Sequence, residues 1–137
     1  MVAIEEIPFT EIEKYGVISG DLIDGTNDTY RVTNMIEKPN SHDLMEFIGN
    51  KIDLNKVPSF MAIIGRYILT PDIFDILRNI KPDKNNEIQI TDALLAQAKQ
   101  GKVIAYKFKG KRFDCGNVKG YLEATNHFAN TLGINNI

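Results

Sequence analysis

An apolar run in the middle of the chain constrains the fold more than any other feature. Residues 59–69 read SFMAIIGRYIL, and the run lies between Pro58 and Pro71. Proline lacks the backbone N–H that a strand ladder needs, so it marks the limits of a strand on either side. A run this apolar, with such limits, predicts a central strand that is buried on both faces. Such a strand needs neighbouring strands and covering helices.

The rest of the chain supplies alternating strand-like and helix-like segments. Further strands are predicted at residues 2–7 (VAIEEI), 15–19 (YGVIS), 31–37 (RVTNMIE) and 102–110 (KVIAYKFKG). Turn-forming residues at 20–30 predict a hairpin connection. Helical patterns occupy residues 41–52, the segment after Thr70, part of 87–101, and 117–133. This alternation predicts an α/β fold with a mixed sheet, in a single domain spanning residues 1–137.

Polar residues and glycine suggest where the helices begin and end. Ser41, Thr70 and Thr91 are the predicted caps of the first three helices, with Pro71 at the first position of the second. Gly101 is the predicted end of the third. The predicted inward faces are Ile73, Phe74, Ile76 and Leu77 in the second helix, and Tyr121, Leu122, Thr125 and Phe128 in the last.

Charge and cysteine content exclude several classes of partner and site. The 137 residues include 16 Lys and Arg against 18 Asp and Glu, a net charge of −2, so no positive field attracts nucleic acid or an anionic membrane. No apolar run approaches the roughly 20 residues of a spanning helix, and the N-terminus lacks a signal-peptide pattern. One cysteine cannot form an internal disulfide, and one cysteine with two histidines makes a structural zinc site improbable. We expect a cytoplasmic protein.

Two features near strand ends are candidate ligand contacts. Glu37 and Lys38 stand side by side where the strand at 31–37 ends, and Gly16 lies at the start of another strand. A carboxylate can accept sugar hydroxyl protons, and an ammonium can face a phosphate. Glycine allows a ligand to approach the backbone closely. Taken alone, each feature is more typical of a solvated strand end or a bend.

The segment GKRFDCGN, residues 110–117, contains the only cysteine. Three interpretations of this segment are a nucleophilic Cys115, a metal-binding Asp114, and a tight turn. Neither histidine is near Cys115 in the sequence and Asp114 disfavours a thiolate, so a small packed side chain is the better interpretation of Cys115. A lone aspartate is not a magnesium site, because that ion takes one or two carboxylates together with phosphate oxygens.

The order of the motifs resembles a known family. The quoted segments VAIEEIP, YGVIS, VTNMIEKP, AIIGRYILTPDIFDIL, NEIQITDALL and GKRFDCGNVKGYLEA are together similar to the C-terminal half of bacterial UTP–glucose-1-phosphate uridylyltransferases, or UDP-glucose pyrophosphorylases. The similarity covers nearly the whole chain. It implies the mixed-sheet portion of a Rossmann-like sugar nucleotidyltransferase fold, with the N-terminal nucleotide-binding half absent.

The resemblance also implies roles for individual residues. The backbone of Gly16 would contact a sugar hydroxyl, Glu37 would bind glucose hydroxyls, and Lys38 would face the sugar-linked phosphate. Asp114 would be one of two aspartates that hold Mg²⁺ against the nucleotide phosphates. The expected partners of the complete enzyme are glucose-1-phosphate and UTP or UDP-glucose.

The sequence departs from the family's pattern at two places. Phe60 precedes Met61 where the family usually has an asparagine, and the segment 42–58 is longer than usual. No stretch resembles the family's Gly-rich nucleotide loop. We therefore expect a fragment of a uridylyltransferase that is inactive alone.

Alternatives to a uridylyltransferase fragment are a thymidylyl- or adenylyltransferase of the same superfamily, or an inactive remnant that acts as a binding or oligomerisation module. We also expect an open sheet edge that favours self-association.

Overall fold

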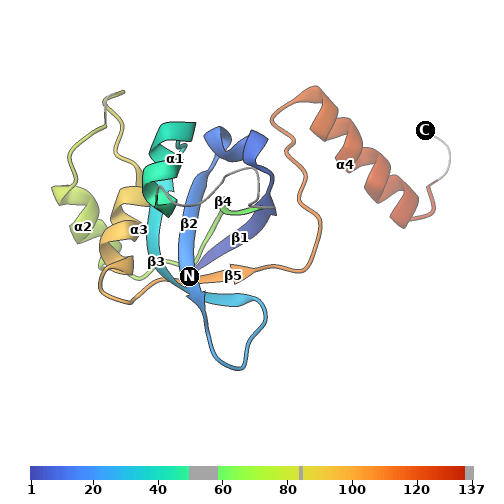
Figure 1. Cartoon of the computed structure of the whole chain (residues 1–137). Coiled ribbons are helices and arrows are strands. Elements are labelled where there is room, and N and C mark those ends of the chain that lie inside the picture. The colour runs from blue at the N-terminus through green and yellow to red at the C-terminus, as the bar shows by residue number, and fades with distance from the viewer. Residues whose placement is uncertain (50–58, 84, 135–137) are drawn as a thin grey trace.

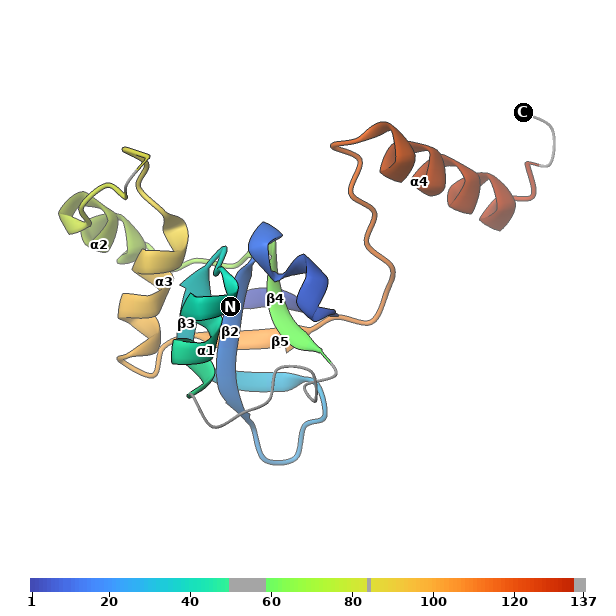
Figure 2. The same cartoon turned by 45° about the horizontal axis from the view of Figure 1, so that its top comes forward.

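The computed structural model describes residues 1–49, 59–83 and 85–134. A five-stranded sheet forms the centre of the molecule, with helices α1, α2 and α3 against it (Figure 1). Helix α4 lies apart from the sheet at the end of an extended segment, and a view turned by 45° shows the same separation (Figure 2). The predicted alternation of strands and helices is therefore confirmed, whereas the isolated position of α4 was not predicted.

The sheet is mixed and closes on itself. Its strands are β1 (Val2–Ile7), β2 (Gly16–Leu22), β3 (Thr29–Glu37), β4 (Phe60–Tyr67) and β5 (Ile104–Lys107). They follow the order β1-β4-β2-β3-β5, and β5 pairs in parallel with β1 to complete the ring. The other pairs are antiparallel. The predicted open edge is wrong for this sheet, because each of these strands has a neighbour on both sides.

Strand β4 is the predicted central strand. It pairs with β1 on one side and β2 on the other, and Phe60, Ala62 and Ile63 are buried. Its last part, which includes the exposed Arg66, reaches the rim of the sheet. The apolar run therefore forms the expected strand, while its polar end faces solvent.

Two apolar clusters fill the space between the sheet and its covering elements. Helices α2 (Ile73–Asn79) and α3 (Ile90–Ala98) cover the larger cluster. Helix α1 (Ser41–Ile48) and the 3-10 helix η1 (Phe9–Lys14) cover the smaller one. The larger cluster consists of Val2, Ile4, Ile18, Val32, Met35, Ile63, Ile73, Ala93, Leu94, Ala98, Val103 and Ala105. The smaller consists of Ile7, Ile12, Val17, Leu44, Phe60 and Ala62.

All three predicted N-terminal helix caps are wrong, beginning with those of α1 and α3. Asn40 caps α1, since its side chain accepts a hydrogen bond from the Asp43 N–H at 2.9 Å, and Ser41 is already helical. Helix α3 begins after Gln89, so Thr91 lies inside the helix rather than before it. A cap must have non-helical backbone angles, and neither Ser41 nor Thr91 meets that condition.

The second helix also begins later than predicted. Helix α2 starts at Ile73, and the Thr70 hydroxyl bonds the side chain of Asp72 rather than a helical N–H. Ile73 is buried as predicted, but Phe74 is 61% exposed. The helix is too short to bury both neighbouring positions against the sheet.

Helix α4 (Val118–Thr131) follows β5 along the chain. The Asn117 side chain caps it by accepting from the Gly120 N–H at 2.8 Å. The predicted inward residues Tyr121, Leu122 and Phe128 are exposed. Among the described residues, no helix combines the length and apolar character needed to cross a membrane.

Candidate functional site

The start of β2 and the end of β3 lie next to each other in the sheet. Gly16 pairs with Glu37 of β3 on one side and with Ile63 of β4 on the other. A Cβ atom built on Gly16 would stand 2.9 Å from Oε2 of Glu37, which is closer than real Cβ atoms approach an oxygen. The glycine therefore leaves the space that the Glu37 carboxylate occupies.

Helix α3 holds the Glu37 carboxylate in place. The Thr91 hydroxyl donates a hydrogen bond of 2.5 Å to Oε2 of Glu37, and Thr91 is only 4% exposed. On the other side, Nζ of Lys38 lies 3.7 Å from Oε1 of Glu37. The two oxygens of Glu37 thus have different neighbours, a neutral hydroxyl donor from α3 and the adjacent ammonium.

The backbone turns sharply directly after Glu37. Lys38 has a φ of 42°, in the left-handed region that side-chain-bearing residues rarely adopt. Its N–H donates to the Tyr15 carbonyl at 3.1 Å, and the following Pro39 is fully buried. Such a conformation costs roughly 1–2 kcal/mol, so the surrounding contacts must hold it. The turn ends the strand and leaves the ammonium of Lys38 half-exposed beside the carboxylate.

The negative charge of Glu37 affects the pKa of Tyr67, at the end of β4. Burial raises the pKa of the Tyr67 hydroxyl, and the negative charge of Glu37 raises it further. The phenol can both donate and accept hydrogen bonds, and it lines a separate pocket of about 230 Å³ beside Met1, Ala3 and Arg66.

A cavity of about 500 Å³ opens beside Glu37 and Lys38. Its other lining residues are Asp43, Asp83, Asn85, Glu87 and Gln89. These side chains provide several carboxylate and amide groups and one ammonium. That combination can accept hydrogen bonds from a ligand rich in hydroxyl groups and neutralise one anionic group on it.

Hydrogen bonds to Asp83 hold together the part of the cavity lining formed by residues 83–89. Oδ1 of Asp83 accepts from the N–H groups of Asn85 and Glu87, and Oδ2 accepts from Nε2 of Gln89 at 3.0 Å. Asn86 has a φ of 63°, as a tight turn requires. These contacts fix the direction of the Glu87 and Gln89 side chains at the cavity.

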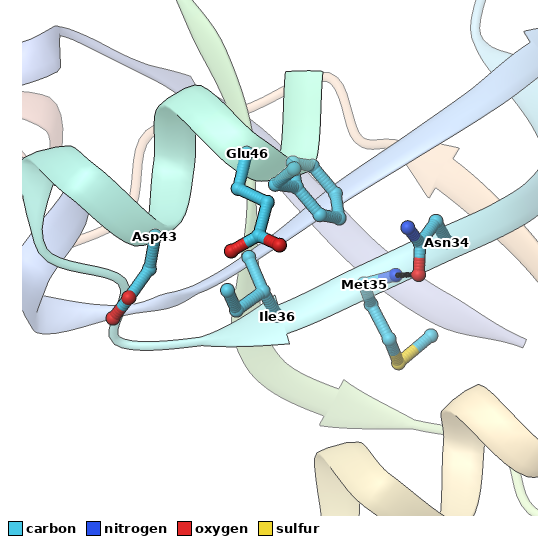
Figure 3. A pocket seen from close by; sticks show the side chains of 6 residues that line it. Asn34, Met35, Ile36, Asp43 and Glu46 are labelled. Carbon is cyan, nitrogen blue, oxygen red and sulfur yellow. Dashed lines mark hydrogen bonds between the residues drawn. The ribbon is translucent and has the colours of Figure 1, made fainter. Parts of the chain in front are cut away.

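A second hollow of about 350 Å³ lies between β3 and α1, and the described residues that line it include no basic group. Figure 3 shows Asp43 and Glu46 projecting from α1, with Asn34, Met35 and Ile36 on the strand. Phe47 completes its lining. Because only acidic and neutral side chains line it, this hollow does not suit a phosphate.

Asp114 is not brought together with Glu37 and Lys38 in the same cavity. It is exposed, in the segment between β5 and α4, and its Oδ1 accepts from the Gly116 N–H at 3.0 Å. The described residues contain no group of three or more His, Cys, Asp or Glu side chains that could hold a metal ion. Asp114 can therefore supply one ligand to Mg²⁺, and the substrate phosphates or another carboxylate would have to supply the others.

Cys115 is exposed, so its predicted packing is wrong. The extended segment leaves α4 too far from the sheet to cover the thiol. The predicted difference in the segment 42–58 lies partly outside the described residues, at 50–58.

Two residues of the site escaped the sequence analysis. Thr91 was assigned to a helix cap, and Tyr67 was treated as part of a buried strand. Thr91 bonds Glu37 across 54 positions, and the charge of Glu37 acts on the pKa of Tyr67 across 30 positions, which no local pattern indicates. The only available signal was a hydroxyl residue in the first turn of a helix, and that signal is also typical of caps.

Comparison with known proteins places this chain among nucleotide-transferring enzymes. The sequence profile described as "nucleotidyl transferase" matches residues 1–131. A UTP–glucose-1-phosphate uridylyltransferase of Pseudomonas aeruginosa is 54% identical over 126 residues, which are 92% of this chain and 40% of the relative. One of Streptococcus pyogenes is 37% identical over 130 residues, which are 93% of this chain and 38% of the relative.

Comparison with solved structures finds the same kind of protein. A UDP-glucose pyrophosphorylase complexed with UDP-glucose superposes with a TM-score of 0.75 at 52% identity, covering 95% of this chain and 44% of that one. The UTP-bound enzyme from Acinetobacter baumannii has a TM-score of 0.66 at 27% identity, covering 93% and 39%. The chain spans about 40% of the length of the curated relatives it matches. By its sequence profile, its relatives and its fold, this chain belongs to the nucleotidyl transferase family.

Proposed function

We propose that this chain is the C-terminal, sugar-phosphate-binding portion of a UTP–glucose-1-phosphate uridylyltransferase. The complete enzyme forms UDP-glucose and pyrophosphate from UTP and glucose-1-phosphate. The observation that carries the proposal is the junction of Gly16, Glu37, Lys38 and Thr91 at the mouth of a polar cavity. The names of the relatives and the UDP-glucose in a matched structure support it.

The cavity suits glucose-1-phosphate in two respects. Oε1 of Glu37 has no hydroxyl donor bound, unlike Oε2, so it can accept from a sugar hydroxyl. The Lys38 ammonium is exposed enough to meet a phosphate without leaving its position beside Glu37. The absence of a side chain at Gly16 leaves room for the Glu37 carboxylate in the position from which it would bind the sugar.

In the proposed reaction, a phosphate oxygen of glucose-1-phosphate attacks the α-phosphorus of UTP. A new oxygen–phosphorus bond forms, and the bond from the α-phosphorus to the pyrophosphate oxygen breaks. Glu37 orients the sugar and Lys38 the attacking phosphate, and Lys38 also reduces the repulsion between two anionic substrates. Mg²⁺, when bound, would neutralise charge on the nucleotide phosphates, with Asp114 as one of its ligands.

Activity tests need a full-length protein. A suitable one is a chimera of the Pseudomonas aeruginosa relative in which this chain replaces the matched span, which is 54% identical. Below, this protein is called the chimera.

The first prediction concerns Glu37. In the chimera, Glu37→Gln should raise KM for glucose-1-phosphate by about 10- to 100-fold with little change in KM for UTP, because a hydrogen bond to a charged acceptor contributes about 1.5–3 kcal/mol. Steady-state kinetics with each substrate varied in turn measures both values.

The control is Glu46→Gln, which removes a carboxylate from the second hollow. It should leave both KM values unchanged. Equal losses for the two substrates in the Glu37 variant would contradict the assignment.

The second prediction concerns Thr91 as a positioning residue for Glu37. Thr91→Val preserves the shape of the side chain but removes the hydroxyl donor. KM for glucose-1-phosphate should rise about 3- to 10-fold, less than the full value of a hydrogen bond to a carboxylate, because Glu37 itself is still present to bind the sugar. Thr91→Ser keeps the donor and should stay near wild type. If serine were as damaging as valine, the role of Thr91 would be packing rather than orientation of Glu37.

The third prediction separates Asp114 from Cys115. In the chimera, Asp114→Asn should raise the Mg²⁺ concentration for half-maximal activity by at least about 10-fold, the loss typical even of groups that only orient a metal ligand. Cys115→Ser should keep most of the activity, since the thiol is exposed and has no assigned role. A folded but inactive Cys115→Ser enzyme would show that the two roles are reversed.

A further inference from the structure

Tyr15 contacts two parts of the chain that carry different residues of the proposed site. Its backbone carbonyl accepts a hydrogen bond from the N–H of Lys38 at 3.1 Å. Its hydroxyl accepts another, of 2.8 Å, from Nη2 of Arg112. Arg112 stands two residues before Asp114, in the segment between β5 and α4. Tyr15 therefore joins the proposed phosphate-binding residue to the segment of the proposed metal ligand.

Three contacts fix the guanidinium of Arg112. Besides the bond to the Tyr15 hydroxyl, its Nε donates to Oε2 of Glu5 at 2.8 Å, and its Cζ lies 5.1 Å from the centre of the Tyr15 ring. A planar guanidinium can bond two acceptors and cover an aromatic ring at once, whereas an ammonium lacks this fixed fork of donors. The side chains of Arg112 and Glu5 are 26% and 33% exposed. We call Glu5, Tyr15 and Arg112 the Arg112 cluster.

The Arg112 cluster anchors a segment that runs away from the sheet towards α4 (Figures 1 and 2). Asp114 itself is exposed, and the bond from the Gly116 N–H to its Oδ1 shapes the turn without joining it to the sheet. Glu5 belongs to β1, and Tyr15 directly precedes β2. The cluster thus ties the segment to two elements of the sheet, one of which begins beside the Glu37 carboxylate.

The placement of the two parts relative to each other matters for the proposed reaction. Lys38 would orient the attacking phosphate of the sugar, and Asp114 would hold the ion on the nucleotide phosphates. Transfer at phosphorus needs the attacking and leaving oxygens roughly in line. An error of about 1 Å in such an alignment can lower the rate about 100-fold. Contacts that fix one part relative to the other therefore act on the rate even when they touch no substrate.

We propose that Tyr15 and Arg112 are positioning residues that hold Asp114 in a fixed place relative to Lys38. Tyr15 acts at both ends, through its carbonyl on Lys38 and through its hydroxyl and ring on Arg112. Glu5 holds the guanidinium from the other side. The effect on catalysis rests on the proposed function, whereas the anchoring of the segment does not.

Two adjacent glutamates of β1 provide a matched pair of substitutions. Glu5→Ala removes the ion pair with Arg112, and Glu6→Ala removes the one with Lys107, in which Nζ lies 2.8 Å from Oε1 of Glu6. The two ion pairs have the same length and both are partly exposed, so the two variants should lose similar amounts of melting temperature. A difference between them in any other measurement then reflects the Arg112 cluster rather than general stability.

The first test uses the chain alone, without substrate or metal. Backbone amide order parameters of residues 112–116, from nitrogen-15 NMR relaxation, measure how firmly the segment is held. We expect values of about 0.85, typical of rigid backbone, in the parent and in Glu6→Ala. Glu5→Ala should lower them to about 0.6 or below, and Tyr15→Phe should lower them less, because the ring still lies against the guanidinium.

The second test measures kinetics in the chimera. Tyr15→Phe and Arg112→Lys should each lower kcat by about 10-fold or more and leave both KM values within about 3-fold, because the residues that bind each substrate remain and only their alignment is lost. The double variant should lose no more than the worse single variant, since both substitutions break the same link. The control is Tyr30→Phe, at the opposite end of β3 from Glu37, which should leave kcat unchanged.

Each result decides a separate part of the proposal. Equal order parameters in Glu5→Ala and Glu6→Ala would overturn the anchoring of the segment. Unchanged kcat in Tyr15→Phe, or a double variant whose loss is the product of the two single losses, would overturn the joint role of Tyr15 and Arg112 in alignment. A parent chimera that makes no UDP-glucose would contradict the proposed function instead, and the order parameters would still decide whether the cluster holds the segment of Asp114.

Discussion

The hydrogen bond from Thr91 to Glu37 is the contact on which the candidate site depends. It links the helix that covers the larger apolar cluster to the end of the strand that carries the functional pair, Glu37 and Lys38. A hydrogen bond to a carboxylate contributes about 1.5–3 kcal/mol, enough to hold one side-chain conformation against its alternatives. Gly16 makes the arrangement possible because any larger residue there would occupy the place of the carboxylate. The core of the domain and the geometry of the site are thus coupled through one hydroxyl.

The second functional candidate is positioned by a different set of contacts. Asp114 follows Arg112 and Phe113, of which one is bound to the sheet side and the other to α4. The hydrogen bond that Arg112 donates to the Glu5 carboxylate raises the pKa of the guanidinium above its ordinary value, and this ion pair fixes the segment at its near end. At the far end, the backbone of Asp114 touches α4.

Much of this could be predicted from the sequence where the signal is local. The apolar run between two prolines identified β4, and the Glu37-Lys38 pair was placed correctly at the end of β3 because a proline follows it. Caps were less predictable, since Asn40 and Ser41 stand side by side and either could accept the first helical N–H. The closure of the sheet could not be predicted, because the parallel pairing of β1 with β5 joins residues about one hundred positions apart. For the same reason Thr91 was taken for a cap, and its bond to Glu37 was missed.

The most direct measurement of the central claim is a titration of this chain with glucose-1-phosphate, followed by the backbone amide signals in a two-dimensional nitrogen–proton NMR spectrum. We expect the largest shifts at Gly16, Lys38 and Thr91, with inorganic phosphate alone moving Lys38 but not Thr91. Shifts confined to Asn34, Glu46 and Phe47, which line the second hollow and not this cavity, or no shifts at millimolar sugar phosphate, would contradict the assignment of the cavity beside Glu37 as the sugar-phosphate site.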